Sequence, residues 1–328
     1  MAEKTALYSL SISARATLDM HSLNNEGGEG NQIQTRMVNI VGADGRLHNV
    51  NAISGDMFKH IQAEHLFRLG NGKLPLCSAC KEFNANRISA DEGYGQAISD
   101  KSDAAALNLM LVTCALDDMA GNLITAGNRS IPRKSVVEFS WVVGLPEVTV
   151  TDSYFHVKYA SERSHDRRKA DSAEEARGAN LGQAIFHRPA SSGVYAVVAN
   201  LELSRIGFND ITQTYAVSEE AREERHKALL ESMLCTFLEP RGAMRSTQNP
   251  HIVAFDGIVA VSKQVLPAPT FSPLGQEFVA ELQRVQRALD SLHPGAVELY
   301  PFESLGEFAE VMARLVQTTK PLTLAYSG

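Results

Sequence analysis

The chain has 328 residues, of which 44% are hydrophobic, and its formal net charge is −7 at pH 7. This size and composition predict a large buried core, and the net negative charge disfavours a protein whose whole surface binds nucleic acid. The sequence contains no apolar run long enough to cross a bilayer and no signal peptide after Met1, so we expect no membrane partner and a cytoplasmic location. The four cysteines are too few and too scattered for a disulfide framework.

The N-terminal residues predict a strand followed by a hairpin. Over residues 6–15, apolar residues alternate with small or polar ones, which is typical of a strand with one apolar face and one small, polar face that can receive a ligand. Residues 23–30 have the composition of a glycine-rich loop. Residues 34–41 and 46–50 then form a predicted hairpin, because Asp44-Gly45 is a strong turn signal.

A helix is predicted to begin at Ser54, which is a suitable N-cap residue. Its first turn presents backbone N–H groups beside Lys59 and His60, and a helix start of this kind binds anions. An ordinary amphipathic helix has the same pattern, so the signal is weak by itself. The apolar residues at helical spacing are Met57, Phe58, Ile61, Leu66 and Leu69.

The order of strand, hairpin and helix favours an α+β fold rather than repeated βαβ units. Residues 70–128 read as an irregular insertion with an apolar helix near 104–116, and residues 136–143 as a returning strand. A long β-hairpin is predicted over 154–205, with a charged tip at 161–171, a turn at 189–193 and a strand over 194–203. We then expect a helix over 218–238, a strand over 251–261 and helices near 276–292 and 303–318.

The basic residues are concentrated in three parts of the chain. Residues 125–137, 176–201 and 240–255 contain no Asp or Glu, although each range contains arginine. Such stretches also arise by chance, because charge is spread unevenly over an average surface. We favour the interpretation that they contribute to one binding track on an otherwise acidic protein.

Five segments carry a resemblance to a known family. They are Leu23-Asn-Asn-Glu, Asn51-Ala-Ile-Ser-Gly-Asp-Met-Phe-Lys-His, Asp117-Asp-Met-Ala-Gly, Arg133-Lys-Ser-Val-Val-Glu-Phe-Ser and Arg241-Gly-Ala-Met-Arg-Ser. Together they resemble the DevR-type CRISPR-associated family of the RAMP superfamily. The similarity runs over nearly the whole chain in the expected order, and the segment around Ser54 is fairly specific.

The resemblance implies a modified RNA-recognition-motif (ferredoxin-like) palm with an inserted fingers region and a β-hairpin thumb. We expect one elaborated domain, in which residues 1–69, 129–151 and 206–328 form the palm, residues 70–128 the fingers and residues 152–205 the thumb.

The family's function is that of a crRNA-binding backbone subunit in type I Cascade complexes, without catalytic activity or a cofactor. Neighbouring copies would assemble along one crRNA, which then hybridises with target DNA to form an R-loop. Further expected partners are other Cascade subunits and a recruited helicase-nuclease or transposition protein. Arg and Lys would supply a sequence-independent grip on phosphates, while base pairing reads the sequence.

The resemblance also implies which residues contact RNA. Each group has a structural alternative: the asparagines as loop caps, the basic pair as solvated charges, Phe186 as a packing residue and Met244 as a filler of the core. Gly242 would allow a close backbone approach in its loop. The expected contacts are Asn24, Asn25, Ser54, Lys59, His60, Arg133, Lys134, Gln183, Phe186, His187, Arg188, Arg241, Gly242, Met244, Arg245 and Ser246.

Cys77-x-x-Cys80 has the spacing of half a zinc site. The second pair is missing, so Cys114, His60 or His65 would have to complete a tetrahedron. The sequence therefore leaves a zinc site open as an alternative to the absence of any cofactor.

The alternative function is a RAMP-type metal-dependent ribonuclease that acts on guide or target RNA. Asp19 stands just before the first loop, and the neighbouring Asp117 and Asp118 could bind a metal ion together. A transcriptional autoregulator ranks last, because the sequence has no helix-turn-helix signature.

Overall fold

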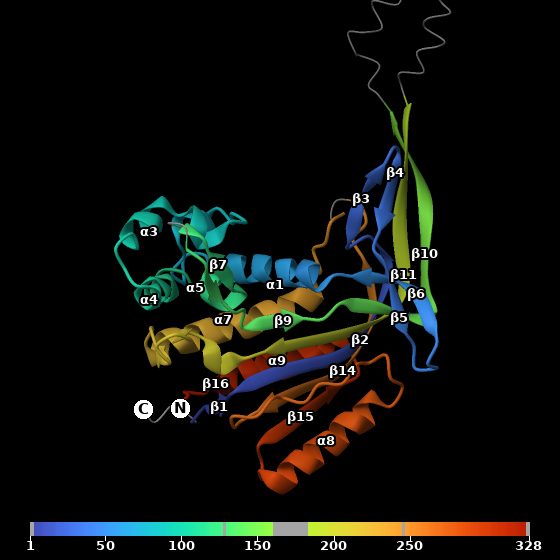
Figure 1. The fold of residues 1–328 in the computed structure, drawn as a ribbon. Coiled ribbons are helices and arrows are strands. Elements are labelled where there is room, and N and C mark those ends of the chain that lie inside the picture. The colour runs from blue at the N-terminus through green and yellow to red at the C-terminus, as the bar shows by residue number, and fades with distance from the viewer. Residues whose placement is uncertain (1–2, 127–128, 160–182, 245–246, 326–328) are drawn as a thin grey trace, which may run out of the picture.

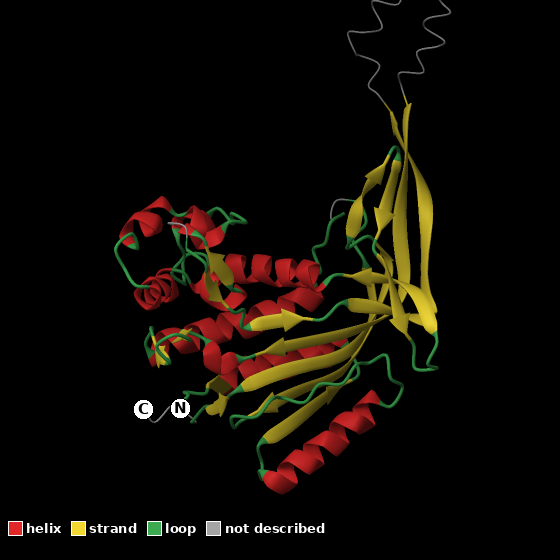
Figure 2. Ribbon diagram, in the orientation of Figure 1, coloured by secondary structure: helices red, strands yellow, loops and turns green. Residues whose placement is uncertain are grey.

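The structure is a computed structural model and describes residues 3–126, 129–159, 183–244 and 247–325. The chain forms a mixed fold of sheets and helices, as predicted, around one ten-stranded sheet (Figures 1 and 2). The main path through this sheet is β15-β14-β2-β11-β10-β6-β5, and β4 and β9 also pair with β11. Its strands are β2 (Ser9–His21), β3 (Asn25–Glu29), β4 (Gln32–Thr35), β5 (Met37–Val41), β6 (Leu47–Ile53), β9 (Val137–Phe139), β10 (Val142–Tyr159), β11 (Gln183–Leu201), β14 (His251–Ser262) and β15 (Val297–Phe302).

Three helices cover one face of the sheet: α1 (Gly55–Gly70), α7 (Glu219–Leu238) and α9 (Leu305–Thr318) (Figure 2). The predicted starts of α1 and α7 are confirmed, since Ser54 accepts a hydrogen bond from the Met57 N–H and Ser218 accepts one from the Ala221 N–H. Between the layers, Phe255 of β14 stacks on Phe237 at 4.8 Å between ring centroids and meets Phe308 edge-on at 5.0 Å. Burial of apolar surface between these layers therefore holds the sheet to its helices.

The small, polar face of β2 is covered by another segment of the chain. Residues 264–275 lie across it, and the Ser11 hydroxyl donates a hydrogen bond to the Pro269 carbonyl at 2.7 Å. Ser9 accepts one from the Ala268 N–H at 2.8 Å, and Arg15 donates to the carbonyl of Pro273. The expectation that this face of β2 can receive a ligand is wrong for Ser9 and Ser11, because their hydroxyls are buried and hydrogen-bond to the backbone of the covering segment. Helix α8 (Phe278–Leu292) follows the covering segment and packs against Ile258 of β14.

Strands β10 and β11 form a long antiparallel hairpin that projects beyond the helical layer (Figure 1). The predicted hairpin began at residue 154, but β10 already begins at Val142. Both strands also pair with other strands of the sheet. The predicted tip at 161–171 lies outside the described residues. The turn predicted at 189–193 is wrong: β11 continues through it, with a shift in its pairing to β2 at Gly193, which has φ +153°.

The first loop and the first hairpin differ partly from prediction. Residues 25–29 of the predicted loop form β3, which pairs with β4. The β5–β6 hairpin is confirmed, and Gly45 has the positive φ of 73° that suits a glycine in its turn.

The described residues of the insertion, 71–126, contain several short helices in addition to the predicted apolar one, which is α4, and they lie at the far end of α1 from the hairpin (Figure 1). None of the helices in the described parts of the chain is long and apolar enough to span a membrane. The elements of this insertion are α2 (Ser78–Lys81), η1 (Arg87–Ala90), α3 (Glu92–Ala97), α4 (Asp103–Thr113), α5 (Ala115–Ala120) and β7 (Asn122–Ile124), which pairs with β8 (Ile131–Arg133).

The smaller elements are two short β-ladders and a turn of helix after the hairpin. They are β1 (Thr5–Leu7) paired with β16 (Thr319–Pro321), η4 (Leu203–Arg205), and β12 (Phe208–Asn209) paired with β13 (Thr214–Tyr215).

Candidate nucleic-acid interface

Four segments that are far apart in the sequence meet beside the start of α1 (Figure 1). We call residues 23–25, 54–55 and 187–190, together with the described residues 241–244 and 247–248, the four-segment junction. The Asn24 side-chain oxygen accepts a hydrogen bond from the Ser54 N–H at 2.8 Å, and the Leu23 carbonyl accepts one from the Ala243 N–H at 3.0 Å. The junction therefore directly joins the first loop, the helix start and the loop around Gly242, which we call the glycine loop (residues 241–244).

The hairpin joins the junction through two side-chain contacts. Arg188 of β11 donates to the Thr247 hydroxyl at 3.3 Å, and the Gln248 amide donates to the Pro189 carbonyl at 3.0 Å. The Nε of Arg188 is buried and has no hydrogen-bond partner among the described residues. His187 is exposed one position earlier, with its ring edge-on to Phe155 at 5.6 Å. The hairpin thus brings the Arg188 side chain to the junction, whereas the ring of its strand neighbour His187 lies on the opposite face of β11, against Phe155.

A hollow of about 360 Å³ opens at the N-terminus of α1, and Ser54, Lys59 and Trp141 are among its lining residues. The partial positive charge of a helix start and the Lys59 ammonium both favour an anion here. Burial, together with the nearby charge of Arg87, lowers the pKa of Lys59. Asp56 and Glu138 also line the hollow, so its charge is mixed rather than uniformly basic.

Trp141 is a candidate contact that the sequence reasoning missed. It is the only tryptophan in the chain, and it is 43% exposed in the same hollow as Lys59. The Arg36 guanidinium lies over its ring at 5.2 Å. An exposed indole beside cations is suited to stacking on a nucleobase. The signal in the sequence was a lone tryptophan inside the predicted strand 136–143.

Several predicted contacts have partners within the chain. Asn24 is buried and caps the Ser54 N–H, and the side-chain oxygen of Asn25 accepts a hydrogen bond from Ser22, so the loop-cap alternative describes both. A Cβ at Gly242 would lie 2.5 Å from the Leu23 Cα. The close approach that Gly242 allows is therefore to the chain's own first loop.

Arg133 lies inside the protein, so the prediction that it contacts RNA is wrong. Its guanidinium donates to the carboxylates of Asp118 and Asp210 and to three backbone carbonyls. Arg225 donates to the other oxygen of Asp118 at 2.6 Å. Because all three of Arg133, Asp118 and Arg225 are buried and paired with one another, this cluster presents no charge to a ligand.

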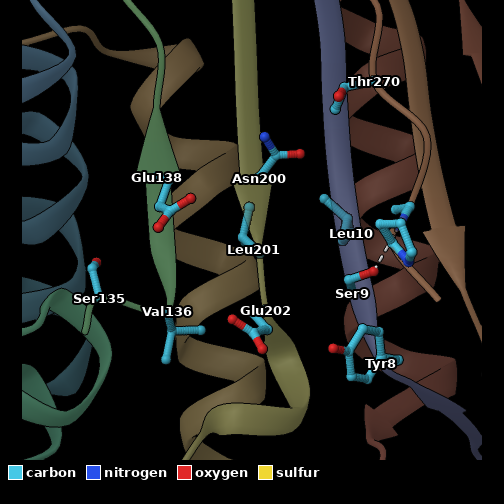
Figure 3. A pocket seen from close by; sticks show the side chains of 12 residues that line it. Tyr8, Ser9, Leu10, Ser135, Val136, Glu138, Asn200, Leu201, Glu202 and Thr270 are labelled. Atoms are coloured by element: carbon cyan, nitrogen blue, oxygen red, sulfur yellow. Dashed lines mark hydrogen bonds between the residues drawn. The ribbon is translucent and has the colours of Figure 1, made fainter. Parts of the chain in front are cut away.

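Lys134 is exposed, but its ammonium lies between Glu138 and Glu202, at 3.4 and 3.6 Å. These two carboxylates also line a second hollow of about 360 Å³ between β2, β9 and β11, where Figure 3 shows Glu138 on β9 and Glu202 just after the end of β11. Ser9 and Ala268, at the opposite wall of that hollow, are hydrogen-bonded to each other. Two carboxylates disfavour phosphate binding in this second hollow.

The remaining predicted contacts divide into exposed, partly paired and undescribed residues. His60 is exposed, and its ring lies 5.7 Å from that of Phe83. Arg241 is half-buried and forms an ion pair with Glu239 at 2.6 Å, and Met244 is half-buried in the same loop. Arg245 and Ser246 lie outside the described residues, as do the side chains of Gln183 and Phe186, whose backbone belongs to β11.

A family model described as CRISPR-associated negative auto-regulator DevR/Csa2 matches residues 12–283. The chain belongs to this family. It is 24% identical over 271 residues to a protein of Saccharolobus solfataricus named CRISPR-associated protein Cas7/Csa2 1, covering 79% of this chain and 81% of that protein. It is 26% identical over 270 residues to CRISPR-associated protein Cas7/Cst2/DevR of Methanocaldococcus jannaschii, covering 79% and 82%.

Solved structures similar to this DevR/Csa2 family chain include a CRISPR RNA-guided surveillance complex in a pre-nicking state. The TM-score is 0.48 at 11% identity, covering 94% of this chain and 99% of that one. Another CRISPR RNA-guided surveillance complex gives a TM-score of 0.47 at 13% identity, covering 94% and 98%. Csc2 of Thermofilum pendens gives 0.39 at 11% identity, covering 95% and 85%.

The metal-binding pair proposed for a ribonuclease is wrong for this DevR/Csa2 family chain. Each oxygen of Asp118 accepts a hydrogen bond from a buried arginine, and the Gly207 N–H donates to both, so Asp118 has no position left for a metal ion. Asp117 faces the other way, toward Cys77 and Cys80. Asp19 lies in β2 opposite His251, and among the described residues it belongs to no group that could hold an ion.

Proposed function

We propose that this chain is the crRNA-binding backbone subunit of a type I CRISPR surveillance complex. The observation that carries the proposal is the four-segment junction. It brings together the first loop, the helix start, the hairpin and the glycine loop, which are the segments in which the DevR family resemblance implies RNA contacts. Membership in the DevR/Csa2 family supports the same function.

In this proposal the large sheet and its helices α1, α7 and α9 are the modified RNA-recognition-motif palm. The helical insertion over residues 70–128 is the fingers region, and the β10–β11 hairpin is the thumb. The junction lies where the hairpin leaves the sheet, so a guide strand that passes the start of α1 also meets the thumb.

Binding at the junction would combine a backbone grip with stacking. Lys59, Arg188 and Arg241 supply positive charge for phosphates, and the N-terminus of α1 adds oriented N–H groups. Trp141 and His187 offer exposed rings on which a displaced base can stack. None of these contacts reads a base edge, so base pairing between guide and target DNA would supply the sequence specificity.

Charge favours binding that depends on assembly. The net charge is −7, and acidic side chains flank both Lys59 and Arg241. A single copy therefore offers a short basic track, whereas neighbouring copies join their tracks along one crRNA. Tight binding of short RNA by the isolated chain at physiological salt would contradict this arrangement.

We further propose that the chain is not an enzyme and acts in the cytoplasm. Its remaining partners would be other Cascade subunits and a recruited helicase-nuclease or transposition protein. The ribonuclease alternative loses support because Asp118 is fully engaged by arginines.

The test is to co-express the chain with a CRISPR array and its partner subunits, sequence the RNA that co-purifies, and add complementary target DNA with magnesium. We expect repeat-spacer RNA of discrete length in a multimer that captures the target. Absence of RNA from the assembled complex would contradict the proposal. RNA cleavage that disappears in Asp19→Asn would support the ribonuclease instead.

A further inference from the structure

Three cysteines and one aspartate converge inside the helical insertion. The sulfur atoms of Cys77, Cys80 and Cys114 and a carboxylate oxygen of Asp117 all lie within 4.8 Å of one another, and all four residues are buried. They come from three places: Cys77 and Cys80 at the start of α2, Cys114 between α4 and α5, and Asp117 in α5. The sequence spacing suggested only half of such a site.

The donor set fits a tetrahedral ion. With Zn–S bonds of about 2.3 Å, the corners of a tetrahedron are roughly 3.8 Å apart. The Asp117 Oδ2 lies 3.2 Å from the Cys80 Sγ and 3.7 Å from the Cys77 Sγ. A contraction of at most about 1 Å would therefore bring four ligand atoms around one ion.

The backbone supports Cys77 as a negatively charged ligand. The Cys80 N–H donates to the Cys77 sulfur at 3.3 Å, which favours the thiolate over the thiol. The Ile88 N–H donates to the other oxygen of Asp117 at 3.3 Å, which leaves Oδ2 directed at the sulfurs. An ordered ligand set of this kind requires little rearrangement on binding a metal ion.

Two adjacent aspartates show what the cluster lacks. Asp118 is buried and has Arg133 and Arg225 as cationic partners. Asp117 is equally buried, yet no ion pair between the described residues includes it, and its neighbours are thiols. A buried carboxylate is costly without a compensating charge, and a divalent cation would supply one.

We propose that Cys77, Cys80, Cys114 and Asp117 bind one zinc ion as a structural site. Soft thiolate ligands favour zinc over magnesium or calcium. Four protein ligands fill a tetrahedron, so the ion would have no open position for water and would not act in catalysis. Its role would be to fasten α2 to the α4–α5 junction and thereby fix the helical insertion. This inference depends on the fold alone and does not require RNA binding.

The first test measures metal content by mass spectrometry in protein purified without a metal-binding tag and under reducing conditions. We expect about one zinc ion per chain. Cys80→Ser should lose the zinc, whereas Cys235→Ser should keep it, because Cys235 lies in α7 and outside the cluster. Iron or copper in place of zinc would overturn the assignment, as would a chain without metal after reconstitution with zinc.

A second test needs no variant and therefore does not depend on variant folding. Cobalt should replace zinc in the wild-type protein and give the absorption of thiolate-to-cobalt charge transfer. Titration with a mercurial reagent should release the bound metal as the thiols react. A Cys77–Cys80 disulfide in the freshly purified protein, or cobalt binding without thiolate absorption, would contradict the proposal. Neither result would alter the RNA test above, so the two proposals can fail independently.

Discussion

The four-segment junction and the helical insertion both place polar groups away from water, but they satisfy them differently. At the junction, neutral hydrogen bonds such as Asn24 to Ser54 hold the segments together, and cationic and aromatic side chains remain at the surface. In the insertion, Asp118 is enclosed by Arg133 and Arg225. Basic side chains therefore serve two purposes in this protein. At the insertion they are buried partners of Asp118, and at the junction they remain accessible to a ligand.

Asp118→Asn should have the largest effect on stability. The substitution removes the negative charge that pairs with the buried Arg133 and Arg225. Removal of one partner from a buried ion pair costs about 3–5 kcal/mol. Urea unfolding would measure the loss. Asp210→Asn is the matched control, since Asp210 also contacts Arg133 but has a side chain that is 34% exposed, and we expect a cost of about 1 kcal/mol or less. If the two variants lost equal free energies of unfolding, burial of Asp118 would not explain its contribution to stability.

Gly242→Ala should lower stability and also reduce RNA retention. The new Cβ meets the Leu23 backbone at 2.5 Å, and overpacking of this kind costs about 1–3 kcal/mol. Gly95→Ala is the control, because a Cβ there finds its nearest neighbour, Ala126, at 4.0 Å. The amount of crRNA that co-purifies per chain would be compared between the two. If a folded Gly242→Ala complex retained as much crRNA as the wild type, the glycine loop would not be part of the RNA interface.

Ser54→Ala and Ser102→Ala separate helix capping from RNA binding. Each serine caps a helix, α1 and α4 respectively, and each loss should cost about 1 kcal/mol in unfolding experiments. Only Ser54 lies at the junction, so crRNA retention should fall in that variant alone. If both variants retained equal amounts of crRNA, the result would contradict a contribution of Ser54 to RNA binding.

Lys59→Gln should have the smallest effect on the fold and a selective effect on binding. Loss of one phosphate contact reduces the slope of log affinity against log salt by about one. The assembled complex would be titrated with labelled guide RNA at several salt concentrations. Lys263→Gln provides the control, because Lys263 pairs with Glu298 at 2.6 Å and lies away from the junction segments. An unchanged slope for Lys59→Gln would exclude it as a phosphate contact.

The sequence predicted the local elements well, because their signals are local. The start of α1 at Ser54, the turn at Gly45 and the extents of α7 and α9 follow from caps, turn residues and apolar spacing. Residues 189–193 were wrongly predicted as a turn, since pairing with β2 overrides the local composition there.

The sequence could not separate polar residues that face a ligand from those that face the chain itself. The sequence suggested that Arg133 is a basic residue at the surface. Its hydrogen-bond partners are distant in the sequence, since Asp118 precedes it by 15 residues and Arg205 follows it by 72. The serines of β2 looked open to a ligand, but residues more than 250 positions later cover them. Such partners are set by tertiary packing, which periodicity and spacing do not encode.

The most direct test of the central claim is ultraviolet crosslinking of crRNA to the assembled complex, followed by mass spectrometry of the crosslinked peptides. We expect crosslinks at the junction and its hollow, on peptides that contain Trp141, His187 or Met244, and none in α8, on the other side of the sheet. Crosslinks confined to α8 or to the helical insertion, with the junction peptides unmodified, would contradict the claim.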